Sequence, residues 1–527
     1  LFNNSIVSSI RFDNDIINNN LKNLVTNNKI VIIENRIYPR HLYDAEFNVC
    51  NRINDLLNTK VSSFDESKID SFISRFEEDN FNLTREQKSA VKLSLKEKIS
   101  IITGGPGTGK TTILRCILQV LAALKDEDLH NDSFTRSLLL LAPTGKAAKR
   151  MSAQTTIAAS TIHKALGYDE TGHFAKGKSD RLDASFVIID ESSMIDIDLM
   201  SHLLDALNNS TRLIFVGDVN QLPSVGPGNV LSDLITSQKI KVSYLSEIMR
   251  QASDSNIIKL AQMINNKNID FNIFNDKKEV FFYNVNEAQI MPLILKILAR
   301  FKETGADFYN DMQILAPMYS GLSGIDELNK AIQNTFNSNN DIIKSGEQVY
   351  KVFDKVLQTA NDPKLEIMNG DTGVIKAINK TDDETNLYID FDSRLVKYSS
   401  RNLSDLTLGY AISIHKSQGS EYKNVIIPIS RASRIMLKKK LLYTAVTRAK
   451  EKVILIGDIN TLTDSLYKED DVRLTSLARM LNPSLLASVD NKKEKEIIRI
   501  DDPVSAFSFI GETNMDSLTP YDFLDKE

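Results

Sequence analysis

Residues 104–111 read GGPGTGKT, which fits the phosphate-binding pattern GxxxxGK followed by Ser or Thr. Residues 99–103, just before it, are β-branched and apolar, as in a buried parallel strand. Residues 112–124, just after it, contain no glycine or proline and have the apolar spacing of a helix. The sequence therefore predicts a glycine-rich turn between a strand and a helix N-terminus, where backbone N–H groups and the helix dipole can bind phosphate.

This turn predicts a site for ATP and Mg²⁺, whereas a glycine-rich turn that fits the pattern by chance is the alternative. Lys110 would reach the β- and γ-phosphates, and the hydroxyl group of Thr111 would hold Mg²⁺. The residues expected to contact the nucleotide here are Gly105, Pro106, Gly107, Thr108, Gly109, Lys110, Thr111 and Thr112.

Two further predicted strands end in polar residues that suit nucleotide hydrolysis. Asp190 and Glu191 follow the apolar run 186–189. Asp190 would coordinate Mg²⁺ through water, and Glu191 would orient and deprotonate the attacking water. Gln221 follows the apolar run 213–216 and can hydrogen-bond the γ-phosphate. A solvated acidic strand end is the alternative for the two carboxylates.

The composition is that of an ordinary globular protein, with 527 residues, 42% hydrophobic and 25% charged. The net charge of −5 gives no global basic excess, so we expect any nucleic-acid site to be a local groove. Cys50 and Cys116 form no disulfide pattern, and no apolar run reaches the length of a membrane span. Without a signal-peptide pattern either, we expect a cytoplasmic protein with no membrane partner.

The alternation of apolar runs and helical patterns predicts an α/β fold that contains two parallel sheets. We expect a mostly helical region with a linker at 1–80, an α/β domain at 81–265, a second at 275–470, a small β-barrel inserted at 348–405, and a C-terminal tail at 471–527, flexible beyond Pro483.

Six more segments, taken together with the motifs above, occur in the order typical of a known family. The set resembles superfamily 1 DNA helicases of the RecD-like branch, a group similar to the exodeoxyribonuclease V alpha subunit. The six segments read FNLTREQKSA at 81–90, APTGKAAKRM at 142–151, TIHKALG at 161–167, LSEIMRQ at 245–251, LGYAISIHKSQGSEY at 408–422 and YTAVTRAK at 443–450. The resemblance implies two RecA-like P-loop NTPase domains, an SH3-like inserted barrel and a helical N-terminal region.

The resemblance also assigns expected roles at the nucleotide. Gln87 would read adenine, Glu421 would bind the nucleotide, and Arg250 and Arg448 would face the phosphates. Arginine suits that role because its planar fork of donors can stabilise charge on the transferred phosphoryl group. The alternative for either arginine is a surface ion pair.

For DNA, the resemblance implies contacts that grip phosphates without reading sequence. The expected DNA-binding residues are Pro143, Thr144, Lys146, His163, His415 and Ser417. Residues 167–185 would form a short hairpin that acts as a pin and splits the duplex, with Phe174 as the aromatic residue at its tip. A plain surface hairpin is the alternative.

The function that the resemblance implies is an ATP-dependent DNA helicase, an ATP hydrolase coupled to unwinding, which moves 5′-to-3′ on single-stranded DNA. It would act on single strands and duplex junctions in DNA repair or recombination. A DNA-stimulated ATPase or translocase subunit of a larger recombination complex, without autonomous unwinding, stays open as an alternative. A non-catalytic DNA-binding subunit would not need the intact phosphate-site residues, whereas an RNA helicase would use the same chemistry.

Overall fold

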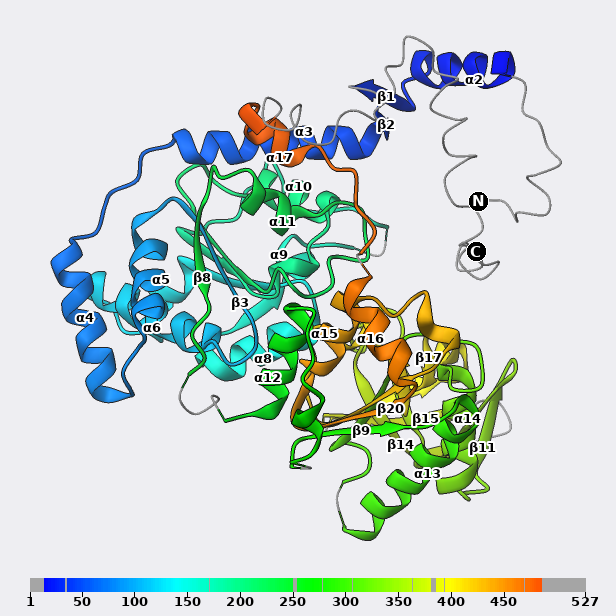
Figure 1. Ribbon diagram of the computed structural model, residues 1–527. Coiled ribbons are helices and arrows are strands. Elements are labelled where there is room, and N and C mark those ends of the chain that lie inside the picture. The colour runs from blue at the N-terminus through cyan, green and yellow to red at the C-terminus, as the bar shows by residue number, and fades with distance from the viewer. Residues whose placement is uncertain are drawn as a thin grey trace.

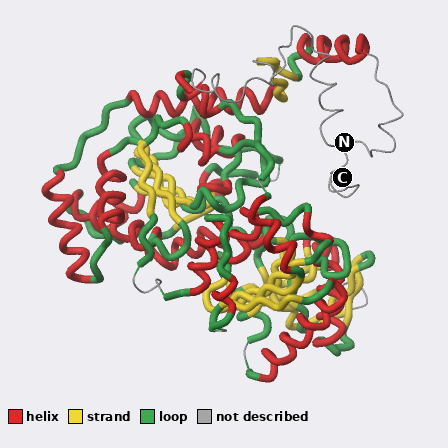
Figure 2. Tube along the Cα trace, in the orientation of Figure 1, coloured by secondary structure: helices red, strands yellow, loops and turns green. Residues whose placement is uncertain are grey.

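The computed structural model describes residues 14–485, apart from 34–35, 170, 250–253, 277, 306, 363, 381–384, 393 and 469. Two parallel sheets organise these residues, and helices surround each of them (Figures 1 and 2). The predicted α/β fold class is confirmed. No helix in the described part of the chain is both long and apolar enough to cross a bilayer.

The first sheet has six parallel strands in the order β5-β4-β6-β7-β3-β8. Its strands are β3 (Ile99–Gly104), β4 (Leu138–Ala142), β5 (Ala159–Thr161), β6 (Phe186–Ile189), β7 (Arg212–Gly217) and β8 (Lys241–Leu245). The helix α5 (Arg85–Lys96) precedes the first of these strands, and the helices between them are α6 (Lys110–Leu124), α7 (Asp132–Arg136), α8 (Gly145–Thr155), α9 (Ile162–Ala165), α10 (Ile197–Asp205) and α11 (Val230–Thr236).

Both faces of this sheet are covered, which explains why its central strands read as continuous apolar runs. Every residue of β6 and β7 is buried. Val187 and Ile189 face the core shared with α10 and α11, whereas Phe186 and Ile188 face the core shared with α5 and α6. The alternation of side chains along a strand therefore fills two separate cores.

The second sheet has five parallel strands in the order β18-β10-β19-β20-β9. Its strands are β9 (Val280–Asn284), β10 (Met312–Ala316), β18 (Ala411–Ser413), β19 (Tyr422–Ile429) and β20 (Ala449–Gly457). The helices of this part are α12 (Asn256–Asn265), α13 (Glu287–Glu303), α14 (Ile325–Phe336), α15 (Lys439–Val446) and α16 (Ile459–Tyr467).

An antiparallel sheet is inserted between β10 and β18, in the order β16-β15-β14-β13-β17. Its strands are β13 (Lys355–Gln358), β14 (Thr372–Lys380), β15 (Thr385–Phe391), β16 (Arg394–Ser399) and β17 (Leu406–Leu408). A hairpin of β11 (Ile342–Ser345) and β12 (Gln348–Lys351) precedes it. We call this inserted sheet the barrel insert.

Two of the N-terminal helices pack into the first sheet's cores. The N-terminal elements are α2 (Asn14–Thr26), the hairpin of β1 (Ile30–Ile33) and β2 (Arg36–Pro39), α3 (Arg40–Asn58) and α4 (Glu66–Asp79). On α3, Ile53 and Leu56 are fully buried against the same core as α10. On α4, Phe76 is buried in the other core. The helices α3 and α4, which were expected in a separate N-terminal region, therefore cover both faces of the first sheet.

The segment at 471–485, which we call the C-terminal segment, also differs from the expected tail. Its helix α17 (Leu477–Leu481) lies beside α3 and α11 at the first sheet (Figure 1). Leu477 and Leu481 are buried in that core, and Arg473 donates hydrogen bonds to the carbonyl oxygens of Gly226 and Gly228, both at 2.7 Å. Apolar residues recur in this short stretch without a long helical period, and that is too weak a signal to predict this docking. Residues 486–527 of the expected tail lie outside the described part of the chain.

A buried carboxyl group lies under the C-terminal segment. Asp233 of α11 is 7% exposed, and its Oδ1 accepts a hydrogen bond of 3.0 Å from Thr475. Among the described residues its Oδ2 has no partner. Burial, together with the charge of nearby Glu46, raises the pKa of Asp233 from its ordinary value of 3.8 to about 7.

We predict that the protein loses stability as the pH rises through about 7, because Asp233 then becomes charged in a buried site. The native state binds this proton more tightly than the unfolded chain does. The stabilisation is therefore complete below the ordinary carboxyl value of 3.8, and it is lost as the pH passes about 7. Urea denaturation at pH values between 5.5 and 8 measures the free energy of unfolding. We expect this free energy to fall by about a few kcal/mol over that range.

Asp233→Asn should flatten this pH dependence, since an amide has no charge to gain. Asp180→Asn, at an exposed aspartate, is the matched control and should keep the wild-type profile. An Asp233→Asn profile that is as steep as the wild-type profile would contradict the prediction.

Candidate functional site

The turn after β3 has a backbone that only glycine accommodates well. Gly107 and Gly109 have φ values of +73° and +82°, in the left-handed region. A Cβ atom on Gly109 would lie 2.4 Å from Nε2 of Gln87 and 2.8 Å from Sδ of Met249. This geometry brings the chain from β3 into α6, which begins at Lys110, and it leaves the turn's N–H groups near a helix N-terminus.

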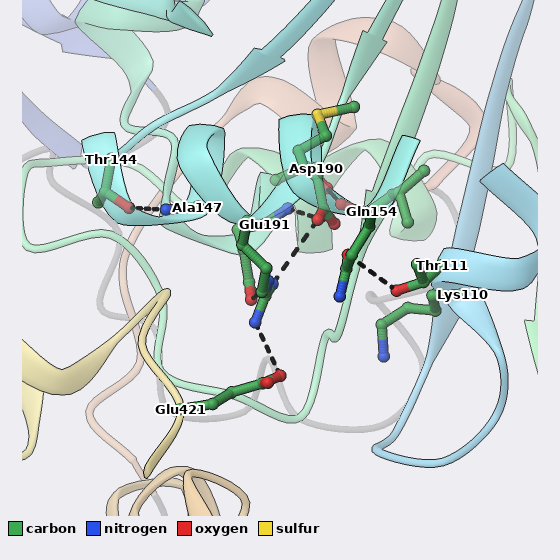
Figure 3. A network of polar contacts seen from close by, with 12 residues as sticks. Lys110, Thr111, Thr144, Ala147, Gln154, Asp190, Glu191 and Glu421 are labelled. Atoms are coloured by element: carbon green, nitrogen blue, oxygen red, sulfur yellow. Dashed lines mark hydrogen bonds and ion pairs between the residues drawn. The ribbon is translucent and has the colours of Figure 1, made fainter. Parts of the chain in front are cut away.

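Lys110 lies inside this turn (Figure 3). Its Nζ donates hydrogen bonds to the carbonyl oxygens of Gly104 at 2.6 Å and Gly105 at 2.9 Å. The Thr108 hydroxyl group also donates to Gly105, at 2.8 Å. The carbonyl oxygens of the turn thus hold the ammonium group of Lys110 where we expect the phosphates to bind.

Gln87 lies at the same turn, where its side chain joins two parts of the backbone. Its Oε1 accepts from the backbone N–H of Thr84 at 3.0 Å, which closes a capping box at the start of α5. Its Nε2 donates to the carbonyl oxygen of Thr108 at 3.0 Å, and the side chain is 1% exposed. In this arrangement Gln87 positions the phosphate-binding turn, and its expected role in reading adenine stays a prediction.

The two predicted carboxylates lie side by side at the carboxyl end of β6. Glu191 has a left-handed backbone, with φ of +50°, and its N–H donates to Oδ1 of Asp190 at 2.9 Å. Burial raises the pKa of Asp190, and the neighbouring charge of Glu191 raises it further. Burial alone would raise the pKa of Glu191 as well, but Arg150 and Arg448 together lower it.

Arg150, which was not among the predicted nucleotide-site residues, is the strongest partner of these carboxylates. It projects from α8, and its Nη2 lies 2.7 Å from Oε1 of Glu191 and 3.7 Å from Oδ2 of Asp190. Its Nη1 lies 2.8 Å from Oε1 of Glu421, which comes from the second sheet (Figure 3). Charge-assisted hydrogen bonds to two carboxylates use the arginine fork fully. Arg150 therefore joins Glu421 to the predicted catalytic carboxylates.

Arg448, which lies between α15 and β20, approaches Glu191 from the second domain. It is 3% exposed, and it donates to the carbonyl oxygens of Thr444 at 3.3 Å and Ser420 at 3.2 Å. Its charge contributes to the lowered pKa of both Glu191 and Glu421. The structure thus brings Arg448 near the predicted general base, although its hydrogen bonds are to backbone carbonyls of its own domain.

Tyr443 and Asp218 form another contact between the two sheets that the sequence analysis missed. The hydroxyl group of Tyr443 donates to Oδ2 of Asp218 at 2.7 Å, in a buried setting. A Cβ atom on Gly105 would lie 3.0 Å from the same hydroxyl group. The position of Asp218 at the end of a parallel strand could have marked it as a site residue. Its partner Tyr443 could not be predicted from local patterns, because it lies 225 residues away.

Gln221 lies on the loop after β7, at the boundary between the two sheets. It is 7% exposed, and its Oε1 has no hydrogen-bond partner in the described part of the chain. The next residue, Leu222, accepts from Nε2 of Gln418 at 3.0 Å and donates to Oγ1 of Thr444 at 3.0 Å. A buried amide oxygen without a partner is costly, which fits a side chain that has a ligand to bind. Arg250 lies outside the described residues.

Thr111 and Asp190, the predicted Mg²⁺ ligands, offer a hydroxyl group and a carboxylate on the same side of the phosphate-binding turn (Figure 3). The Thr111 hydroxyl group donates to Oε1 of Gln154 at 3.3 Å. The described residues contain no cluster of three or more His, Cys, Asp or Glu side chains suited to a metal. Hard oxygen donors in small number fit Mg²⁺, which keeps several waters and binds substrate phosphates.

Of the predicted DNA-binding residues, Thr144 and Lys146 lie where the start of α8 meets the second domain and the barrel insert, whereas the His163 ring packs near Tyr168 and Phe174 in the first domain. Thr144 caps α8, and Lys146 Nζ lies 3.5 Å from Oγ1 of Thr372 in the barrel insert. Pro143 and His163 are half-buried, and His415 is exposed. Ser417 differs: it is fully buried, and its hydroxyl group donates to Ile414 at 2.7 Å, so its side chain is turned away from any ligand.

The prediction for Phe174 at the tip of a pin also differs from the structure. Tyr168 and Phe174 form an antiparallel bridge, and the turn between them is exposed. The Phe174 ring packs inward, 4.4 Å from the ring of His202 and 4.8 Å from that of Tyr168. An aromatic ring gains more from burial against the α10 core than from exposure at a turn, so it anchors the hairpin.

Three stretches of the chain match known protein families. Residues 87–227 match the AAA domain, residues 408–456 match the UvrD-like helicase C-terminal domain, and residues 328–391 match the ATP-dependent RecD-like DNA helicase SH3 domain. The first match contains the glycine-rich turn at 104–111 and both of the predicted catalytic carboxylates.

Curated relatives resemble most of the chain. It is 32% identical over 445 residues to the ATP-dependent RecD2 DNA helicase of Deinococcus radiodurans, an alignment that covers 84% of this chain and 58% of that protein. It is 30% identical over 435 residues to the RecBCD enzyme subunit RecD of Mycolicibacterium smegmatis, which covers 76% of this chain and 75% of the relative. The chain thus spans less than two thirds of the length of the RecD2 protein. It spans about three quarters of the length of the RecD subunit.

Solved structures of Pif1 helicases are also similar to the chain. The Candida albicans protein gives a TM-score of 0.45 at 18% identity, over 73% of this chain and 97% of that one. A Bacteroides protein in complex with ADP-AlF3 and single-stranded DNA gives a TM-score of 0.44 at 19% identity, over 79% of this chain and 98% of that one.

We predict that Gly109→Ala lowers the affinity for ATP at least about tenfold, because the new methyl group meets Gln87 and distorts the turn. A fluorescent ATP analogue titrated against the variant measures this loss. Gly305→Ala is the matched control: Gly305 has a similar φ of +75°, but nothing lies within 4 Å of its Cβ position. Nucleotide affinity that falls equally in both variants would contradict the local explanation.

Proposed function

Because the chain belongs to the RecD family of helicases, we propose that it is an ATP-driven motor that moves along single-stranded DNA and unwinds duplex DNA. One observation carries the proposal. The phosphate-binding turn, Glu191 and its ion-pair partner Arg150 belong to the first domain. Glu421, which pairs with the same Arg150, and Arg448, whose charge lowers the pKa of Glu191, belong to the second. A nucleotide site shared between two domains converts binding and hydrolysis into relative motion.

In the proposed reaction, each of the residues at this junction has one task. Lys110 binds the β- and γ-phosphates, and Glu191 orients the attacking water and accepts its proton. Arg448 stabilises negative charge on the transferred phosphoryl group from the opposite domain. Mg²⁺, when bound through Thr111 and Asp190, would neutralise phosphate charge. Gln221, whose amide oxygen is buried without a partner in the described chain, hydrogen-bonds near the γ-phosphate.

We further propose a path for DNA across the junction. Thr144 and Lys146 lie at the N-terminus of α8, where N–H groups and a cation can bind a phosphate. Lys146 also approaches the barrel insert, which would hold the strand on its other side. Contacts of this kind bind the backbone of either strand without reading bases. Movement in the 5′-to-3′ direction and a role in repair or recombination belong to the same proposal.

The Mycolicibacterium smegmatis relative is named as a subunit of the RecBCD enzyme, which favours a second candidate. In that case the chain hydrolyses ATP and moves on single-stranded DNA, but it separates strands only within a larger complex. The two candidates share every residue of the nucleotide site, so only strand separation distinguishes them.

We predict that the protein unwinds a duplex that has a 5′ tail and leaves 3′-tailed and blunt duplexes paired. Glu191→Gln should bind ATP but lose at least about a hundredfold in hydrolysis, and with it all unwinding, because the amide cannot accept the proton. Strand separation on native gels, together with phosphate release and nucleotide titration, measures the three properties.

Glu451→Gln, at an exposed glutamate of β20, is the matched control and should behave as the wild type. No unwinding, combined with ATP hydrolysis that single-stranded DNA stimulates, would favour the translocase subunit. Hydrolysis retained by Glu191→Gln would remove the role assigned to Glu191.

A further inference from the structure

We propose that α8 links DNA binding to ATP hydrolysis and that Arg150 is its positioning residue, holding Glu191 and Glu421 in one ion-pair network until α8 moves. The proposal rests on the proposed function, because it concerns how DNA stimulates the ATPase. It adds a role for a residue of the 142–151 segment that neither the phosphate-binding motif nor the DNA contacts require.

The N-terminal end of α8 faces the proposed DNA path and the second domain. Thr144 caps the helix by accepting from Ala147 at 3.3 Å, and a Cβ atom on Gly419 would lie 2.7 Å from its Oγ1. A Cβ atom on Gly145 would lie 2.6 Å from Met368, just before the barrel insert's β14. This end of the helix is therefore packed so closely that a bound strand cannot enter between these groups without displacing them.

The middle of the same helix is part of the nucleotide site. Arg150 lies six residues after Thr144, about 9 Å along the helix axis. Its guanidinium group contacts Glu191 at 2.7 Å and Glu421 at 2.8 Å. Lys450 also pairs with Glu421, at 2.9 Å. The side chain of Arg150 thus fixes the predicted general base, Glu191, relative to Glu421, which is predicted to bind the nucleotide.

The last turn of α8 reaches the phosphate-binding turn. Gln154 lies one helical turn after Arg150, and its Oε1 accepts from the Thr111 hydroxyl group at 3.3 Å. The helix therefore contacts the DNA side with its first residues and the ATP side at two successive turns. A short helix transmits a shift of one end to the other, because its backbone hydrogen bonds keep it rigid.

The ion pair with Arg150 gives this shift a chemical consequence. The guanidinium group of Arg150 lies 2.7 Å from Oε1 of Glu191, so this oxygen is not free to contact an attacking water. Once the guanidinium group has moved away, the same oxygen can orient that water. Movement of α8 on DNA binding would thus release the base and free Glu421 for the nucleotide at the same moment.

The test compares ATP hydrolysis by Arg150→Gln with and without oligo-dT. Without DNA the variant should hydrolyse ATP several times faster than the wild type, and stimulation by oligo-dT should fall to below about twofold. Anisotropy of labelled oligo-dT should show DNA affinity within about threefold of the wild type. Binding of a non-hydrolysable fluorescent ATP analogue should no longer respond to oligo-dT, because the two sites have lost their coupling.

Two further variants keep the test decisive. Arg150→Lys retains the charge that compensates the buried carboxylates but lacks the fork that spans both of them, so it should lose most of the stimulation while staying folded. Arg115→Gln, at an exposed arginine of α6, is the matched control and should keep the wild-type ratio.

If oligo-dT stimulates ATP hydrolysis in both Arg150 variants as strongly as in the wild type, the proposed link through α8 is overturned. The proposed function would still stand. Hydrolysis lost with and without DNA, at normal nucleotide affinity, would also overturn it, because Arg150 would then act on the reacting groups. A wild-type protein that oligo-dT does not stimulate would instead refute the proposed function, and the link with it.

Discussion

Two adjacent carboxylates, the half-buried Asp190 and the buried Glu191, lie at the end of a parallel strand, where their charges need compensation. Burying an unpaired charge costs several kcal/mol, on the order of the whole stability of a domain. Arg150 pairs with both of them, and the charges of Lys110 and Arg448 add to the effect. Since Arg448 belongs to the second domain, the compensation of a charge in one domain depends on the position of the other.

Several contacts between the two sheets are polar, although Leu222 packs in the core of the second sheet, and polar contacts suit a junction that has to open and close. Tyr443 binds Asp218, Leu222 binds Thr444 and Gln418, and Arg150 binds Glu421. Polar groups can exchange these partners for water or nucleotide at little net cost, whereas separating an apolar interface would expose its whole area. The C-terminal segment limits the motion differently, because its apolar residues lie in the first sheet's core.

Local patterns in the sequence were sufficient to predict the strand, turn and helix around the proposed phosphate site and the position of the two carboxylates beside it. The apolar strand, the glycine-rich turn and the helix are contiguous, and Asp190 and Glu191 directly follow a buried strand, so strand ends alone bring them together. The role of Arg150 could not be read in this way, because its partner Glu421 is 271 residues away. The predictions for Phe174 and for the C-terminal segment were wrong for a related reason. Burial against a core that is distant in sequence determines where both of them lie.

The central claim is that the ATP site is completed from the second domain, and Arg448→Lys tests it most directly. The claim predicts that the variant binds a fluorescent ATP analogue within a fewfold of the wild type but hydrolyses ATP at least about a thousandfold more slowly, because an ammonium group cannot replace the arginine fork. Single-turnover hydrolysis with saturating ATP separates these two quantities. A hydrolysis rate close to that of the wild type would show that the first domain hydrolyses ATP without Arg448, and it would contradict the account.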